Sequence, residues 1–231
     1  MDSDNTHDRL IRDLTADLKP VQRLWAPTTR AFLWLAVVVA VAVPLASFAD
    51  LPALSERLRA TPDMWLAVTG SALTAVFAAI AAFELSLPDA PRAWALLPLP
   101  PALLWVGASS FGCLRAWIVP ESHIAVLSEA RDCLVFILAF SVPLSMLLFA
   151  MLRRACPLQP GLTAIVAGLA SAAAAATLLN FFHPFDAALT DLVVHGVAVG
   201  LVVAANRAFG GRLLATNIFA GEVTRAAAPS K

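Results

Sequence analysis

The chain has 231 residues, of which 60% are hydrophobic and 14% charged, and its formal net charge is zero. Its mean hydropathy of +0.79 excludes a soluble globular domain of this size, and the balanced charge offers no general attraction to nucleic acid. The composition therefore predicts an all-α polytopic membrane protein.

Residues 1–30 precede the first long apolar run and form the N-terminal segment. Its apolar residues recur at helical spacing and predict one apolar stripe on an amphipathic helix: Leu10, Ile11, Leu14 and Leu18. Pro20 ends or kinks this helix at Lys19. A helix of about ten residues is marginal alone in water, so we expect it to fold against something.

The charges of the N-terminal segment indicate whether it folds on the lipid headgroups or on a protein partner. Its five aspartates balance its five basic residues: Asp2, Asp4, Asp8, Asp13 and Asp17. A helix on the lipid headgroups is the simplest alternative, but anionic lipid repels an acidic face. The pattern therefore favours a protein partner over the membrane surface.

Six apolar runs follow, and a helix needs about 20 such residues to cross a bilayer. They are 31–49, 64–83, 93–114, 133–152, 161–182 and 192–206. The sixth reaches spanning length only if it begins near Ala187 and takes Asp191 into its first turn. Backbone groups in lipid must be satisfied within the segment, so all six are predicted to be helices. This predicts a six-helix domain over 31–206 and a tail over 207–231.

Prolines and small residues predict the shape and packing of these helices. Kinks are expected in the first, third and fourth helices, at Pro44, at Pro98, Pro100 and Pro101, and at Pro143. Close packing is expected where small residues recur every four positions, at Gly70, Thr74 and Ala78 and at Gly168, Ala172 and Ala176.

Basic residues predict the orientation of the chain. The N-terminal segment, the second and fourth loops and the tail hold 12 of the 16 Lys and Arg. The positive-inside rule therefore places both termini in the cytoplasm. Tryptophans near predicted helix ends are typical of an aromatic belt: Trp34, Trp65, Trp94 and Trp117. An Ala- and Arg-rich composition without a eukaryotic sorting signal favours a bacterial inner membrane.

With this topology, a cluster of chemically active residues gathers near the outer ends of helices three to six: Cys113, Cys133, His183, Asp191 and His195. Asp191 and His195 are four residues apart and share a helical face. Cys133, His183, Asp191 and His195 together form a donor set that suits copper or zinc.

Two other interpretations of this cluster remain open. Cys113 and Cys133 face an oxidising compartment and could form a disulfide if their Cα atoms come within about 7 Å. Alternatively, the thiols are small buried hydrophobes, and Asp191 and His195 are a satisfied polar pair. There is no CxxC motif with an activated thiolate, so we expect no enzyme and no resident cofactor.

A small transporter or metal exporter is the alternative function. Such a protein needs ionisable residues near the bilayer centre, or interrupted helices in matching halves of the chain. The sequence has neither feature and no internal repeat, so it gives this alternative little support.

Three stretches resemble the NrsF family of six-helix membrane anti-sigma factors: "DRLIRDLTADLKPVQRL", "CLVFILAFSVPLSMLLFAMLRRACPLQPGLTAIVAGLASAAAAATL" and the "HP" at His183 and Pro184. The resemblance implies that the N-terminal segment sequesters an extracytoplasmic-function sigma factor. It also implies that outer-side cysteines sense oxidants or heavy metals, after which the sigma factor is released.

The resemblance carries over to particular residues. It implies a sigma-binding set of Leu10, Leu14, Asp17, Leu18, Lys19, Pro20 and Val21, of which Asp17, Leu18, Pro20 and Val21 match the family's N-terminal motif. Cys133 matches the first family cysteine, but His183 stands where the second is expected. A disulfide between those two positions is therefore impossible. This departure favours a Cys/His metal site, or a substitute pair of Cys113 and Cys133, as the sensor.

Overall fold

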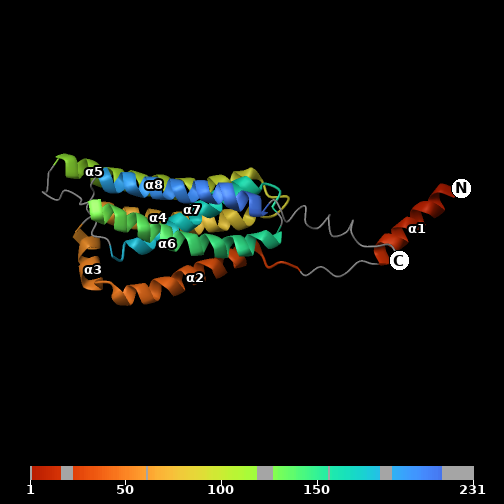
Figure 1. The fold of residues 1–231 in the computed structure, drawn as a ribbon, viewed down its shortest axis with the longest axis horizontal. Helices are drawn as coiled ribbons and strands as arrows, with labels where there is room; N and C mark the ends of the chain where they lie inside the picture. The colour runs from red at the N-terminus through yellow and green to blue at the C-terminus, as the bar shows by residue number, and fades with distance from the viewer. Residues whose placement is uncertain are drawn as a thin grey trace.

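The structure is a computed structural model that describes residues 2–16, 23–60, 62–118, 127–155, 157–182 and 189–214. Six helices lie side by side in one bundle (Figure 1): α2 (Pro27–Phe48), α4 (Pro62–Glu84), α5 (Leu99–Ile118), α6 (Leu127–Leu152), α7 (Pro160–Leu179) and α8 (Leu189–Ala205). Outside the bundle's long helices are α1 (Asp2–Ala16) and α3 (Leu51–Ala60). Three short turns complete the described part: the 3₁₀ turns η1 (Arg92–Leu96) and η2 (Arg153–Ala155), and the π-helical turn η3 (Asn206–Gly210).

All six predicted spans are confirmed as helices long and apolar enough to cross a membrane. The condition set for the sixth run is wrong, because its candidate span Leu192–Leu214 reaches 23 residues without Asp191. The length comes from helical residues that continue through η3 to Leu214, while α8 itself begins at Leu189 and has Asp191 in its first turn. Thus the part of the chain that is long enough to span a bilayer extends beyond the uncharged run.

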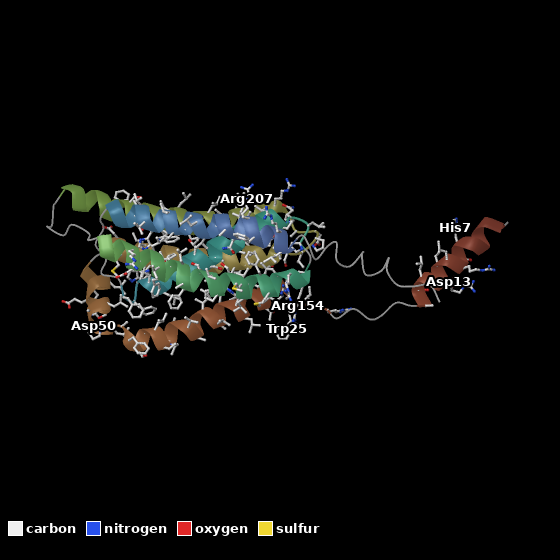
Figure 2. All side chains as sticks on the ribbon, viewed as in Figure 1. His7, Asp13, Trp25, Asp50, Arg154 and Arg207 are labelled. Atoms are coloured by element: carbon white, nitrogen blue, oxygen red, sulfur yellow. The ribbon has the colours of Figure 1, made fainter. Side chains whose placement is uncertain are left out.

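The helices alternate in direction, which gives the bundle two distinct ends (Figure 1). We call the end where α2 begins and η3 lies the entry end, and the opposite end, beside α3, the far end. Arg154 marks the entry end and Asp50 the far end in Figure 2. The described residues form an even number of candidate spans. The start of α2 and the end of the α8–η3 segment therefore lie at the same end of the bundle.

Helix α7 forms the centre of the bundle because most of its side chains are alanine, glycine or serine. It packs against α4, α6 and α8, and its middle, from Ala170 to Ala176, is buried throughout. Small side chains let neighbouring helices approach closely, which is the usual basis of helix association in lipid.

Both predicted small-residue contacts are confirmed at their glycines. A Cβ atom at Gly70 would lie 2.7 Å from the backbone nitrogen of Trp105, so α4 and α5 touch there. A Cβ at Gly168 would lie 2.9 Å from the Cβ of Asn206, where α7 meets the α8–η3 segment. Glycine is required at both positions because the neighbour occupies the space of a side chain.

The prolines lie where breaks in the helices were predicted, but one tryptophan was predicted wrongly. Pro44 and Pro143 lie inside α2 and α6. In the third span the three prolines lie at the junction between η1 and α5, because Pro98 precedes α5 and Pro100 and Pro101 are in its first turn. Trp34 is fully buried and does not belong to an aromatic belt. Its Nε1 donates to the Leu144 carbonyl at 3.1 Å and links α2 to α6.

Candidate functional site

Helix α1 presents the predicted apolar stripe to solvent. Leu10, Ile11 and Leu14 are 57%, 58% and 65% exposed. At about 100° per residue they fall within one sector of the helix, and the charged residues lie outside it: Asp8, Arg9, Arg12 and Asp13. The predicted amphipathic helix is therefore confirmed as far as Ala16, and it begins earlier than expected, at Asp2.

The rest of the predicted sigma-binding set lies outside the described residues: Asp17, Leu18, Lys19, Pro20 and Val21. Helix α1 itself stands apart from the bundle, on the side of the entry end (Figure 1). Where the described chain resumes, Leu24 is 45% and Trp25 66% exposed. Trp25 was not among the predicted residues, although the sequence shows a tryptophan just before the first membrane span.

Arg30 ties the start of α2 to the entry end of the bundle. It is only 5% exposed, and its Nη2 donates to the main-chain oxygen of Met151, at the end of α6. Its Nη1 donates to the Ser86 hydroxyl at 3.5 Å, and its guanidinium lies 4.8 Å from the centre of the Phe83 ring. The N-terminal segment is thus anchored to both α4 and α6.

Arg30 is a functional candidate that the sequence analysis missed. The available signal was an arginine in the first turn of an otherwise apolar span, since ionisable residues there are costly and usually have a partner. Its contacts with Met151 and Ser86 could not be read from the sequence because they join residues 121 and 56 positions away.

Near the far end, the structure brings two of the predicted sensing residues together. Cys133 in α6 is 2% exposed, and its Sγ lies 3.9 Å from Nε2 of His195 in α8. The thiol is buried among Ile137, Ala175, Leu179 and Ala198. His195 is partly exposed, so the pair is reached from the side of α8.

The two atoms lie within hydrogen-bond reach of each other, and a shared metal ion would hold them slightly closer. A tetrahedral ion with a sulfur at about 2.3 Å and a nitrogen at about 2.0 Å holds them roughly 3.6 Å apart. Among the residues that the structure describes, no group of three or more potential ligands comes together. His183 and the side chains of Cys113 and Asp191 lie outside the described part, so the full donor set stays a prediction.

The sequence was compared with known protein families, with curated proteins and with solved structures. The model of the NrsF family, described as "Negative regulator of sigma F", matches residues 14–215. This match takes in all six candidate membrane spans and the end of α1. Searches of curated proteins and of solved structures gave no significant match. Because the family match covers most of the chain, the protein belongs to the NrsF family of negative regulators of sigma F.

Proposed function

We propose that this protein is an anti-sigma factor of the bacterial inner membrane. It holds an extracytoplasmic-function sigma factor through its N-terminal segment and releases it when the far end senses an oxidant or a heavy metal. The observation that carries this proposal is the exposed apolar stripe of α1, which is joined to the entry end of a six-helix bundle in a chain of this family.

The stripe suits a helix-in-groove contact with a protein. An amphipathic helix of this kind inserts its apolar face into a groove and leaves its charged face in solvent. Burying one leucine or isoleucine contributes about 1.5–3 kcal/mol. Leu10, Ile11 and Leu14 therefore supply enough apolar surface for a specific contact, and Leu24 and Trp25 offer more of it nearby.

The proposal requires the entry end to face the cytoplasm, where sigma factors act. The distribution of arginine supports this orientation. In the described bundle six exposed arginines lie at the entry end and two at the far end: Arg23, Arg92, Arg153, Arg154, Arg207 and Arg212, against Arg59 and Arg131. In this orientation both termini are cytoplasmic, and the pair of Cys133 and His195 lies toward the periplasm.

The proposed sensor is built around Cys133 and His195. A thiolate and an imidazole are ligands that copper and zinc both accept, and the thiol is also open to oxidation. His183 and Asp191 would complete a metal site in the outer turn between α7 and α8. Cys113 would be the partner of Cys133 in an oxidative response.

Helix α6 offers a direct physical link between sensor and N-terminal segment. It carries Cys133 near one end and Met151, the acceptor for Arg30, near the other. These residues are 18 positions apart, which is about 27 Å along a helix. A shift of α6 caused by ligation or oxidation would change the anchoring of Arg30. Moving the sigma factor from mostly bound to mostly free needs a difference of several kcal/mol between the two bundle states.

The test is co-purification of the full-length protein from membranes with the sigma factor encoded beside its gene. The double variant Leu10→Asp and Leu14→Asp should weaken capture about a hundredfold, because two buried leucines contribute roughly 3 kcal/mol. The matched control, Arg9→Asp and Arg12→Asp, puts two aspartates on the charged face of the same helix and should retain the sigma factor. Undiminished capture by the leucine variant, at equal membrane levels, would overturn the proposal.

A further inference from the structure

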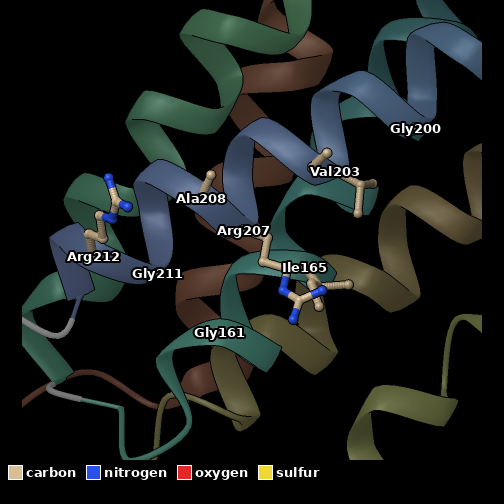
Figure 3. A pocket seen from close by; sticks show the side chains of 9 residues that line it. Gly161, Ile165, Gly200, Val203, Arg207, Ala208, Gly211 and Arg212 are labelled. Atoms are coloured by element: carbon tan, nitrogen blue, oxygen red, sulfur yellow. The ribbon is translucent and has the colours of Figure 1, made fainter.

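A hollow of about 660 Å³ opens on the surface of the bundle between α7 and the end of α8. It lies in the half of the bundle nearest the entry end, because its lining runs from Gly161 and Ile165 of α7 to Gly200, Arg207 and Arg212 of the α8–η3 segment (Figure 3). None of these residues has a part in the candidate sites described above.

The walls of this hollow are apolar and shaped by small residues. Gly200 and Ala204 on α8 leave room, and a Cβ atom added at Gly200 would meet nothing within 4 Å. The walls belong to two helices long and apolar enough to span a membrane. An extended hydrocarbon chain fits such a surface, because close contact with smooth apolar walls replaces its contact with neighbouring lipid.

Two arginines of the segment around the π-helical turn η3 line the hollow, Arg207 and Arg212. Their side chains point in different directions: Arg207 extends toward Ile165, and Arg212 stands nearer the outer end of the segment and points away from Arg207 (Figure 3). Asn206 at the start of the turn is buried against Gly168, and its Nδ2 donates to the Val202 carbonyl at 2.7 Å.

Arg207 lies further into the bundle than Arg212. Gly211 packs at the level of Gly161, so Arg207, four positions earlier, lies about one turn further in, beside Ile165. Its side chain extends across the hollow (Figure 3). Among the residues that the structure describes, none forms a hydrogen bond or ion pair with the Arg207 guanidinium. A cation at this depth calls for an anion that is itself at the membrane boundary.

We propose that the hollow binds one anionic phospholipid. Arg207 holds its phosphate, and an acyl chain lies along the apolar wall between α7 and α8. Guanidinium groups bind phosphate with two parallel hydrogen bonds, and basic pockets between membrane helices are established sites for anionic headgroups. The occupant is a lipid because the hollow joins a charged rim to an apolar floor on the lipid-facing surface.

Native mass spectrometry of the full-length protein in detergent tests this site. Phosphatidylglycerol and phosphatidylcholine with identical acyl chains are the two probes. Phosphatidylglycerol should bind more tightly, and the variant Arg207→Gln should weaken its binding about fivefold. The matched control, Arg153→Gln with Arg154→Gln, removes two exposed arginines of the same end that lie outside the hollow, and it should bind like the unmodified protein.

A second variant tests the contribution of the apolar wall of the hollow separately from that of its arginines. Gly200→Leu keeps both arginines but fills the wall, so it should lower phosphatidylglycerol binding as well. Soluble glycerol phosphate should not compete, because the acyl chain supplies part of the affinity. Equal binding of the two lipids, or an equal loss in the Arg153 and Arg154 control, would overturn the proposal. A dimer that Gly200→Leu abolishes would instead assign the hollow to a second copy of the chain.

Discussion

Arg30 shows how a single charged side chain can be held inside an apolar bundle without a described carboxylate beside it. Its hydrogen-bond acceptor, the Met151 carbonyl, is one of the last groups of α6. Carbonyls at a helix C-terminus lack helical partners and carry partial negative charge. The Phe83 ring adds a cation–π contact. Both contacts depend on the planar guanidinium of arginine, which the ammonium group of lysine cannot replace.

We predict that Arg30→Lys destabilises the bundle by about 1–2 kcal/mol, since the ammonium keeps the charge but loses the planar contacts. The apparent Tm of the purified protein in detergent should fall by about 2–8 °C. The control is Arg23→Lys, at an exposed position just before α2. If both variants have the same apparent Tm as the unmodified protein, the buried contacts of Arg30 contribute nothing to stability.

At the scale of elements, the packing of α4 against α5 depends on one missing side chain. The backbone of Trp105 occupies the place that a Cβ atom at Gly70 would take. Backbone cannot move aside as a flexible side chain can, so an added methyl group must separate the two helices. Overpacking of this kind typically costs 1–3 kcal/mol.

Gly70→Ala should therefore lower the thermal stability of the protein in detergent, with a loss of about 1–3 kcal/mol. Gly107→Ala on α5 is its matched control, because a Cβ atom there meets nothing within 4 Å. That control should be neutral or slightly stabilising, since alanine favours a helix more than glycine does. Equal thermal stability of the two variants would contradict the close contact at Gly70.

At the scale of the whole molecule, the proposed sensor and the proposed sigma-binding segment lie toward opposite ends of the bundle. Helix α6 spans this distance and contacts α2 through both Trp34 and Arg30. A signal at Cys133 therefore has a continuous packed route to the N-terminal segment, and no contact between distant loops is needed.

This arrangement predicts that Cys133→Ser and His195→Ala keep repression but lose induction. Transcription from a promoter of the regulated sigma factor, with copper, zinc or a thiol oxidant added separately, measures both properties. Ser141→Ala is the control, a buried position two turns further along α6. Loss of the metal response alone would identify ligation, and loss of the oxidant response alone would identify thiol oxidation. Normal induction in both variants would mean that the pair serves only packing.

The six membrane spans, the stripe on α1 and the small-residue contacts of Gly70 and Gly168 were predictable from the sequence alone. These features depend on local properties, namely the length of an apolar run, the helical period and the size of a side chain. The family resemblance was also available from the sequence, and it is confirmed by the match over residues 14–215.

The choice of neighbouring helices and the rotation of each helix about its axis became known from the tertiary structure. Helices rich in alanine, leucine and valine have similar surfaces on all sides, so their sequences do not specify a rotation. The structure pairs Cys133 with His195 and Arg30 with Met151, and its π-helical turn interrupts the helical period between Asn206 and Gly210. These contacts join residues far apart in the chain or depend on a local break in the helical period, which no single-sequence pattern reveals.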